Sequence, residues 1–351
     1  MPKGSPVEPP REQPAGEARV SSALTRHRGL ATWGERLVPL AAFRAAAAAA
    51  GARLDPAARA AAVRGYRAPR PDGTPAEGPY RRIAVFGGVY SNHLALAALL
   101  EDASRRGAEA IYCLGDLGGF GPAPEKVWPL LVQGGVATLQ GNYEQALAAG
   151  REDCNCGYTD PRDNEFAALS YQYTAAHCSP ELKRWMAALP TRRRVLLGGR
   201  ELLLVHGSPR RINEFLFRST SPDAFLELLL DQERCDALLC THTGLHWHRR
   251  LPSGREVINV GVIGRPANDG RTEVWYALLE EKGAAASGGG APCAVCGFEV
   301  SLLPLRYSHQ RIAAEMRREE LPEEFVETIL TGWWTTCLEI LPARERAASR
   351  F

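Results

Sequence analysis

The central part of the chain alternates short apolar runs with segments of helical character. Strands are expected at residues 83–86, 110–114 and 136–139, and helices at residues 94–100 and 124–132. A β-α-β-α-β order with such short connections predicts a parallel sheet with right-handed crossovers.

A second group of apolar runs follows after residue 190. These runs have strand length and are closely spaced, so they predict a second sheet in the same domain. They cover residues 193–197, 201–205, 237–240, 257–260 and 273–279. Residues 180–189 predict a helix, and the polar, turn-rich residues 150–178 before it are expected to form an irregular insert.

The N-terminal part differs in composition from this body. Residues 1–28 are polar and proline-rich with few large apolar side chains, which predicts disorder. Residues 29–80 are interpreted as a helical extension and linker. Within them, the alanine-rich residues 36–51 and 55–65 predict helices, and the proline- and glycine-rich residues 66–80 predict the linker.

The body is expected to span residues 81–282, and residues 283–351 to form a glycine-rich linker and a C-terminal extension. In the extension we expect a strand at 298–307, a helix starting at residue 308, and a helix over 322–332, which has proline at its start and glycine at its end.

Composition and charge exclude some classes of protein. The chain has 351 residues, 45% of them hydrophobic, and a net charge of +2, so nothing global directs it to nucleic acid or to an anionic membrane. No apolar run reaches transmembrane length, and the N-terminus does not resemble a secretory signal. Nine cysteines without a regular framework favour a reduced, cytoplasmic setting.

Four strand ends carry side chains that commonly bind metal ions. Each follows an apolar run and precedes turn residues, and the carboxyl ends of parallel strands are where α/β sheets form their sites. The four are Asp116, Asn142, His206 and His242. An aspartate in a glycine-rich turn is ordinary turn chemistry, and a single histidine is more often structural. Together, however, one carboxylate, one amide oxygen and two imidazoles suit Mn, Fe, Zn or Ni.

From residue 83 to residue 280 the chain resembles the calcineurin-like metallophosphoesterases, in particular their small bacterial phosphoesterases. The family's ordered motifs are Asp-x-His, Gly-Asp, Gly-Asn-His-Asp/Glu, a lone His and Gly-His-x-His. The matching segments here are Gly88-Val89-Tyr90, Gly115-Asp116, Gly141-Asn142-Tyr143-Glu144, His206 and Thr241-His242-Thr243-Gly244. The resemblance implies an α/β fold of two packed sheets (a β-sandwich) flanked by helices, here with helical N- and C-terminal extensions.

The resemblance also assigns metal ligands, and this chain departs from the pattern on one side. In the family two ions share the aspartate that corresponds to Asp116. The other ligands of the first ion would be residues 88, 90 and 244, which are Gly88, Tyr90 and Gly244 here. All ligands of the second ion are present: Asp116, Asn142, His206 and His242. The resemblance therefore implies one divalent transition-metal ion in the main site.

The function implied is hydrolysis of a phosphomonoester or phosphodiester in a small phosphorylated substrate, at this altered site. Tyr143 replaces the family's catalytic histidine. Tyr90 and Tyr143 are candidate hydrogen-bond donors to the phosphoryl oxygens, and Glu144 is expected to orient its neighbours. The alternative is a relative of weak or no activity that binds a metal or a phosphorylated ligand and acts through protein partners.

Other residues leave alternatives open. His93, His246 and His248 lie near the degenerate motifs and would restore a second ion if one reached the site; ordinary packed or exposed histidines are the simpler interpretation. Arg210 and Arg211 follow the His206 motif. Their side chains either contact a phosphate or are ordinary exposed surface arginines.

Two close pairs of cysteines, one polar segment and one pair of tryptophans are further candidates for a structural or functional role. A shared structural zinc site is one interpretation of the two close cysteine pairs, and unrelated reduced thiols are the other. These pairs are Cys154 with Cys156 and Cys293 with Cys296. Residues 156–164 are expected to form either a lid over the site or a surface loop. Trp333 and Trp334 are expected to dock onto the body.

Overall fold

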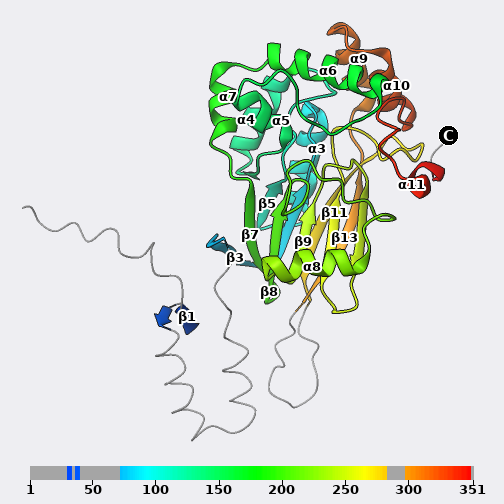
Figure 1. The fold of residues 1–351 in the computed structure, drawn as a ribbon. Helices are drawn as coiled ribbons and strands as arrows, with labels where there is room; N and C mark the ends of the chain where they lie inside the picture. Colours follow the sequence, from blue (N-terminus) through cyan, green and yellow to red (C-terminus); the bar gives the residue numbers. More distant parts are fainter. Residues whose placement is uncertain (1–29, 34–35, 40–71, 283–296, 349–351) are drawn as a thin grey trace, which may run out of the picture. The chain divides into compact units, whose positions relative to one another are not determined.

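The computed structural model describes residues 30–33, 36–39, 72–282 and 297–348 (Figure 1). The chain divides into two units, residues 1–73 and residues 74–351, and the second unit contains the two large sheets.

The first unit contains one described hairpin. Strand β1 (Leu30–Trp33) pairs with the antiparallel strand β2 (Arg36–Pro39). The helix predicted from residue 36 is therefore wrong at its first four residues, because the alanine-rich sequence that suggested it begins only after β2. The remainder of that helix, the helix predicted at 55–65 and the disorder predicted for 1–28 lie outside the described residues.

The second unit is built on two mixed sheets. The six-stranded sheet has the order β10-β11-β9-β8-β7-β3, and the five-stranded sheet has the order β13-β12-β4-β5-β6. The strands of the first are β3 (Ala76–Tyr80), β7 (Arg192–Leu197), β8 (Arg200–Val205), β9 (Ala237–Cys240), β10 (His246–Arg250) and β11 (Glu256–Val260). Those of the second are β4 (Arg82–Phe86), β5 (Ala110–Cys113), β6 (Ala137–Thr138), β12 (Val274–Glu281) and β13 (Phe298–Leu305).

Side chains alternate between the two faces of each strand, and this alternation makes the layers. Ile83 and Val85 of β4 belong to the core between the sheets, whereas Ala84 and Phe86 belong to the core under the helices. All four are fully buried. The runs of consecutive apolar residues arise because both faces of these strands are covered.

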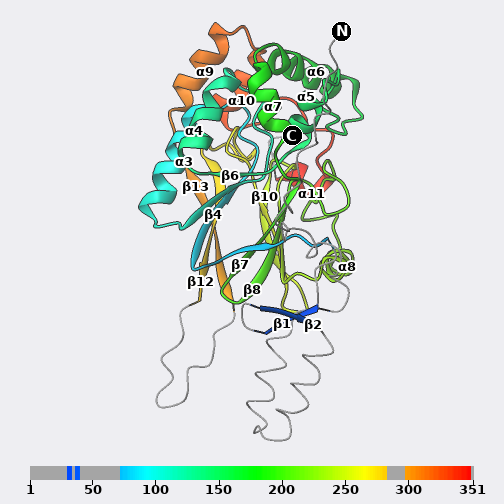
Figure 2. The same cartoon turned by 90° about the vertical axis from the view of Figure 1, so that its left-hand side faces the viewer.

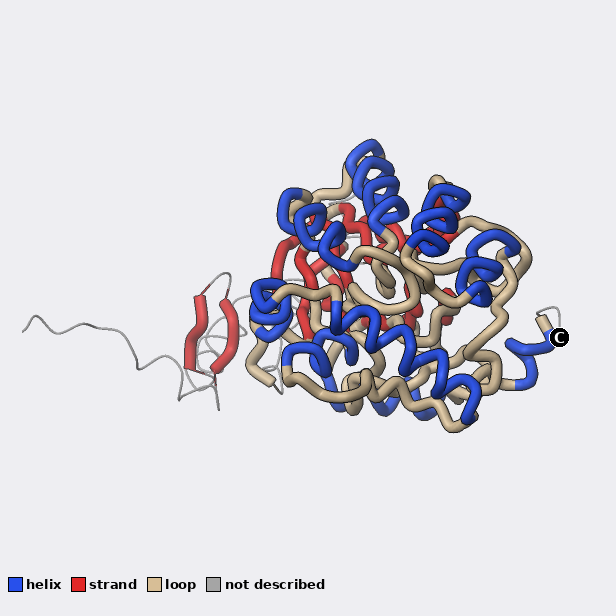
Figure 3. The backbone as a smooth tube through the Cα atoms, turned by 90° about the horizontal axis from the view of Figure 1, so that it is seen from above, coloured by secondary structure: helices blue, strands red, loops and turns tan. Residues whose placement is uncertain are grey.

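Helices cover the outer faces and one end of the sheets. They are α3 (His93–Arg105), the 3-10 turn η1 (Pro124–Lys126), α4 (Val127–Gln133), α5 (Asn142–Ala148), α6 (Pro161–Ala176), α7 (Pro180–Ala187), α8 (Asp223–Glu233), α9 (His309–Arg318), α10 (Glu323–Thr331) and α11 (Ala343–Ala347). Helix α8 packs on the outer face of the six-stranded sheet. Most of the others gather at one end, around the loops that follow the strands (Figures 2 and 3).

This arrangement of two sheets flanked by helices confirms the predicted fold class. Some elements differ from the prediction. Strand β12 pairs with β4 and β13, so it belongs to the five-stranded sheet with β4, β5 and β6 rather than to the sheet of the other runs that follow residue 190. The run of residues 273–279 gave no local sign of its partner, because sheet membership is decided by contacts distant in sequence. Strand β13, which lies beyond the predicted body, is an edge strand of that sheet.

Two further segments are more regular than predicted. Residues 76–80 lie in the predicted linker but form β3, which pairs in parallel with β7. The predicted irregular insert contains the sixteen-residue helix α6. Its start has a capping aspartate, Asp160, whose side chain accepts from the N–H of Asp163, and a proline at the first helical position. The Asp-Pro pair therefore starts a helix inside a segment that was predicted to be irregular.

The C-terminal extension packs against the end of the sheets that carries the helices. Trp334 is fully buried; its indole N–H donates to the carbonyl of Pro266 (2.7 Å), and its backbone N–H donates to the side chain of Asn268 (2.8 Å). Phe325 of α10 packs on Phe120 with ring centroids 4.7 Å apart. The expectation that the tryptophan pair docks onto the body is thus met for Trp334. Among the described residues, no helix is both long and apolar enough to cross a bilayer.

We expect Trp334→Ala to lower the free energy of unfolding by about 3–5 kcal/mol, because it leaves a large cavity and removes two hydrogen bonds. Urea denaturation monitored by circular dichroism measures this. Val132→Ala, at an exposed position of α4, is the control and should change stability by less than about 0.5 kcal/mol. A loss below about 1 kcal/mol for Trp334→Ala would contradict tight docking of the extension.

Candidate metal centre

Four polar side chains from four strand ends meet at the end of the sheets that carries the helices. Asp116 follows β5 and Asn142 opens α5 after β6, both in the five-stranded sheet. His206 follows β8 and His242 follows β9 in the six-stranded sheet. Strands β5 and β6 are parallel, as are β8 and β9, so each pair delivers its side chains to the same edge.

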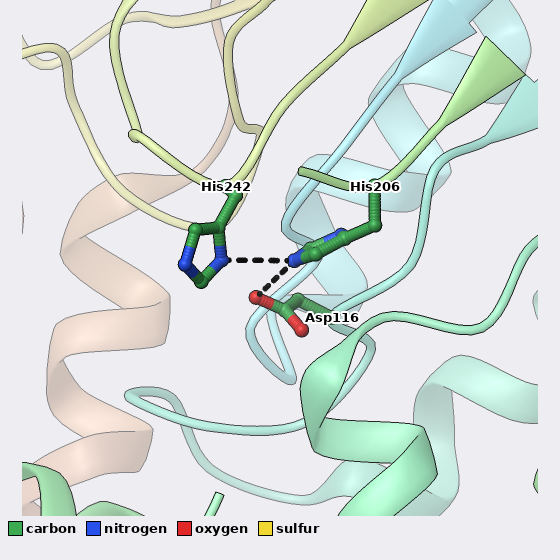
Figure 4. Close-up of side chains that lie close together, drawn as sticks. All are labelled: Asp116, His206 and His242. Carbon is green, nitrogen blue, oxygen red and sulfur yellow. Dashed lines mark hydrogen bonds and ion pairs between the residues drawn. The ribbon is translucent and has the colours of Figure 1, made fainter. Parts of the chain in front are cut away.

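The Nε2 atom of His206 lies at the centre of this group. It is 3.0 Å from Nδ1 of His242, 3.1 Å from Oδ1 of Asn142 and 3.3 Å from Oδ2 of Asp116. Figure 4 shows Asp116 and His242 pointing toward His206 from two sides. All four side chains are buried.

The three distances to Nε2 of His206 are compatible with one transition-metal ion, and the ligand atoms of Asp116, His206 and His242 all lie within 4.8 Å of one another. Ligand atoms about 2.1 Å from a common ion lie about 3.0–3.4 Å from one another in octahedral or tetrahedral geometry. The carboxylate, amide oxygen and two imidazoles would hold such an ion through Oδ2, Oδ1, Nε2 and Nδ1, the atoms that converge.

Hydrogen bonds outside the group fix the orientation of two of these side chains. Nδ1 of His206 donates to the carbonyl of Leu114 (2.7 Å), which leaves the lone pair of Nε2 directed into the site. The amide nitrogen of Asn142 donates to the carbonyl of Cys154 (2.8 Å), and this places its oxygen toward His206. Both contacts are of the kind that orients metal ligands in proteins.

The carboxylate of Glu144 joins the two turns that carry Asp116 and Asn142. It accepts from the backbone N–H groups of Asp116, Leu117 and Gly141, each at 2.8 Å, and is fully buried. Glu144 therefore acts as a positioning residue for Asp116 and Asn142.

The backbone at two of these positions has the left-handed conformation that non-glycine residues rarely adopt. The φ angles are +58° at Asp116 and +67° at His242. Such conformations are costly and persist where the surrounding structure holds them. The turn before Asp116 also needs glycine, because a Cβ atom at Gly115, whose φ is +96°, would lie 2.3 Å from the backbone nitrogen of Gly141.

Burial and the neighbouring charged side chains shift the pKa values of the converging residues, and the direction differs from one residue to the next. Burial disfavours protonation of His206, but the Asp116 carboxylate outweighs it and raises the pKa of His206 above its ordinary value. Burial would raise the pKa of Asp116, but His206 holds it below its usual range. Burial and the neighbouring His206 lower the pKa of His242 to about 3. Burial and Asp116 raise the pKa of Glu144 to about 7.

The positions that the family resemblance assigns to a first ion do not provide ligands here. Large side chains occupy the space that such ligands would need. A Cβ atom at Gly88 would lie 2.4 Å from Cγ1 of Val262 and 2.9 Å from Cζ of Tyr90. A Cβ atom at Gly244 would lie 2.8 Å from the ring of Trp334. The residues present do not fit a second ion at these positions.

A small cavity of about 50 Å³ opens beside the converging ligands. Its walls are mainly aromatic and include both candidate tyrosines together with Asp116 and His242. The lining residues are Tyr90, Asp116, Gly119, Phe120, Tyr143, Cys156, Tyr158, Phe166, Ala167, Ser170, His242, Arg265, Phe325 and Cys337. Burial raises the pKa of the Tyr90 and Tyr143 hydroxyls, which therefore remain protonated near neutral pH. The hydroxyl of Tyr143 lies 3.0 Å from that of Ser170.

Arg265 was not among the residues predicted from the sequence, although its guanidinium is buried in the cavity wall. It follows the glycine-rich segment after β11, and that position was the only local signal. Ser170 and Thr174 of α6 were not predicted as site residues either. Their hydroxyls accept from the backbone N–H groups of Phe120 (2.6 Å) and Gly119 (3.0 Å), and so support the turn after Asp116.

The alternative ligands considered from the sequence have other partners. His93 faces Glu315 with Nε2 and a carboxylate oxygen 3.5 Å apart. His246 stacks on Trp275 with ring centroids 3.9 Å apart, and His248 contacts Glu256 at 2.7 Å.

The two arginines after His206 do not line the cavity. Arg210 forms an ion pair with Glu214. It also packs over the ring of Phe225 at 4.8 Å from the centroid. Arg211 flanks the same turn and lines a separate hollow on the other side of His206.

Of the four cysteines considered for a structural zinc, the structure describes two. The Sγ atoms of Cys154 and Cys156 lie 2.6 Å apart, and Cys156 lines the cavity. Cys293 and Cys296 lie outside the described residues, so the shared zinc site stays a prediction. In the segment considered as a lid or surface loop, Cys156 and Tyr158 line the cavity, and residues 161–164 form the start of α6.

Comparisons with known proteins bear on the family and the fold. The family model of the calcineurin-like phosphoesterase superfamily domain matches residues 82–283. An uncharacterized protein of Methanocaldococcus jannaschii is 24% identical over 264 residues, covering 71% of this chain and 98% of the relative.

Two solved structures share the fold. A metallophosphoesterase from Sphaerobacter thermophilus has a TM-score of 0.53 at 24% identity, covering 72% of this chain and 99% of that one. A hypothetical protein from Pyrococcus horikoshii has a TM-score of 0.57 at 22% identity, with the same coverage of both chains.

We expect Glu144→Gln to weaken Zn²⁺ or Mn²⁺ binding by about 10–100-fold without unfolding the protein, because an amide in this place turns an N–H toward the backbone N–H groups and loosens the turns. Competition with a chromophoric chelator measures the affinity. Glu101→Gln, on the exposed side of α3, is the matched control. Equal affinities of Glu144→Gln and the control would show that the turns do not depend on this carboxylate.

We expect the affinity for a metal ion to increase with pH. The ion requires neutral His206, whose pKa in the metal-free protein is raised, whereas Asp116 is already ionised because its pKa is lowered. Binding therefore displaces one proton, and affinity should rise by up to about tenfold per pH unit until the pKa of His206 is passed, then level off. The same competition assay between pH 5.5 and pH 8.5 tests this, and a flat profile would contradict it.

Proposed function

The chain belongs to the calcineurin-like phosphoesterase superfamily, and from this premise we propose that it is a phosphoesterase with one divalent transition-metal ion at Asp116, Asn142, His206 and His242. The superfamily is one of metallophosphoesterase-type hydrolases. The substrates proposed are small phosphomonoesters or phosphodiesters.

The observation that carries the proposal is the convergence of three donor atoms within 3.3 Å of Nε2 of His206. This set is complete, whereas the positions for another ion are filled by Tyr90 and Trp334. An ion held here would supply a Lewis acid for a phosphoryl oxygen and for a water molecule.

The size of the cavity supports a small reacting group. A volume of about 50 Å³ is room for about three or four water molecules. That space admits a phosphoryl group, and the remainder of a larger substrate would have to lie outside the described cavity.

The tyrosines around the cavity are better suited to bind and orient a phosphoryl group than to transfer a proton to its leaving group. Tyr90 and Tyr143 stay protonated and are suited to donate hydrogen bonds to phosphoryl oxygens. Because Tyr143 stands in place of the family's histidine and its raised pKa makes it a poor acid, departure of the leaving group receives little assistance. We therefore propose that esters with good leaving groups, such as aryl esters, are the better substrates.

The cellular setting is part of the proposal. All seven cysteines that the structure describes are free thiols. Free thiols in this number support a reducing, cytoplasmic compartment.

We expect untagged protein to contain about one transition-metal ion per chain and to hydrolyse p-nitrophenyl phosphate or bis-p-nitrophenyl phosphate. Chelation should abolish turnover and added Mn²⁺ or Zn²⁺ should restore it, because the ion supplies the Lewis acid. His206→Ala should lose the ion and at least about 100-fold of kcat/KM. Elemental analysis and steady-state kinetics measure both.

His177→Ala, at an exposed position at the end of α6, is the control and should keep both the ion and the activity. If metal-loaded wild-type protein turned over neither ester, the result would favour the alternative, a relative that binds a metal or phosphorylated ligand and acts through partners.

A further inference from the structure

The cavity wall contains a buried cation that has no carboxylate partner among the described residues. Arg265 is 6% exposed and lines the cavity together with Asp116 and His242. Its Nε atom is buried without a hydrogen-bond partner. Burial acts to lower the pKa of Arg265, but the thiol of Cys337, which also hydrogen-bonds to the guanidinium, and the phenols of Tyr90 and Tyr158 raise it; none of these groups is a carboxylate.

Aromatic rings hold this guanidinium in place. It stacks on Trp334 at 3.6 Å from the ring centroid, and it lies 5.8 Å from the ring centroids of both Tyr90 and Phe120. Ring faces attract and orient a cation, but they do not neutralise it. A buried charge without a paired anion is strongly unfavourable, so an anionic ligand is the missing partner that the surroundings indicate.

The guanidinium also lies where this chain departs from its family. Nη2 of Arg265 is 3.2 Å from the point where a Cβ atom on Gly244 would be, and the ring of Tyr90 covers Gly88. Gly88 and Gly244 are the two positions at which the first ion's ligands are replaced by glycine. The fixed positive charge of Arg265 therefore lies next to the positions at which the ligands of the first metal ion are missing.

From this geometry we infer that Arg265 binds the phosphoryl oxyanion of the substrate and substitutes for the positive charge of a second metal ion. The inference rests on the proposed function, because it assigns a binding residue to the same site. The guanidinium presents several N–H donors in a planar fork, which matches two oxygens of a phosphoryl group. The low dielectric constant of a buried, largely aromatic cavity strengthens such charge-assisted bonds.

Titration of metal-loaded protein with orthophosphate by calorimetry tests the inference directly, with acetate as the carboxylate probe. Wild type is compared with Arg265→Gln, Arg265→Lys and Arg306→Gln. Arg306 is a charge-matched control, because its side chain is 91% exposed. Metal content is measured on every variant by elemental analysis, since loss of the ion would by itself weaken phosphate binding.

We expect Arg265→Gln to weaken orthophosphate binding by roughly 30–100-fold and Arg265→Lys by roughly 3–10-fold, with the metal content unchanged. Arg306→Gln should bind as wild type does, and acetate should bind more weakly than orthophosphate. Wild type that binds no orthophosphate, equal affinity of wild type and Arg265→Gln, or acetate binding as tight as orthophosphate binding would each overturn the inference.

The stacking on Trp334 means that the Arg265 variants could fail to fold, so a crystal structure of metal-loaded wild type with orthophosphate provides a second test. A phosphate oxygen within hydrogen-bond distance of the Arg265 guanidinium supports the inference, and a phosphate held without that contact overturns it.

The two proposals fail separately. If Arg265→Gln loses phosphate binding while wild type turns over no ester, the proposed hydrolysis is contradicted and the role of Arg265 in binding an oxyanion is supported. If wild type hydrolyses esters while Arg265→Gln has the same phosphate affinity and kcat/KM as wild type, the proposed hydrolysis is supported and the role of Arg265 is contradicted.

Discussion

A single buried carboxylate connects the fold to the chemistry of the site. Glu144 accepts three backbone N–H groups from the turns after β5 and β6, where strand pairing has ended. Without an acceptor each of these buried donors would cost about 1–3 kcal/mol. The same contact sets where Asp116 and Asn142 point, so the stability of the turns and the geometry of the ligands depend on one interaction. The opposing pair, His206 and His242, comes from the other sheet, and the packing between the sheets brings the two halves together.

The sequence predicted the features that a short stretch of residues determines. It did not predict those that depend on contacts between distant parts of the chain. Asp116 and His206 were recognisable because each directly follows an apolar strand and begins a short turn motif, and strand ends of parallel sheets meet at one edge. Strand β12 was assigned to the wrong sheet because its partner β4 is almost 200 residues away along the chain, and nothing in residues 273–279 identifies it. Arg265 was missed because a single arginine after a glycine-rich segment has no distinguishing pattern. Its significance arises only from burial against Trp334 and Tyr90, which come from two other parts of the chain.

The departures from the family pattern form one packed unit rather than three separate losses. The ring of Tyr90 covers Gly88, the indole of Trp334 covers Gly244, and Arg265 contacts both aromatic rings. Restoring an aspartate or a histidine at either glycine would bring its Cβ atom within 3 Å of these neighbours. The C-terminal extension that supplies Trp334 is therefore packed against the site, and the described neighbours of Gly88 and Gly244 leave no room for a ligand side chain at either position.

An ion and a guanidinium are not equivalent, and the difference defines what this site is able to do. An ion shares its charge with every ligand around it and polarises water, whereas a guanidinium offers N–H donors in a fixed plane and has no open coordination position. In a site with one ion, Asp116 has no second ion to bridge. Its Oδ2 faces His206, and its Oδ1 accepts from the backbone N–H of Tyr143 at 3.3 Å. Under the two proposals, Asp116, Asn142, His206 and His242 would hold an ion that supplies a Lewis acid, and Arg265 would bind the phosphoryl oxygens. Arg265 is positioned by aromatic packing against Trp334 of the C-terminal extension. If Arg265 binds the phosphoryl oxygens, that packing is as necessary to the site as the backbone contacts that orient the metal ligands.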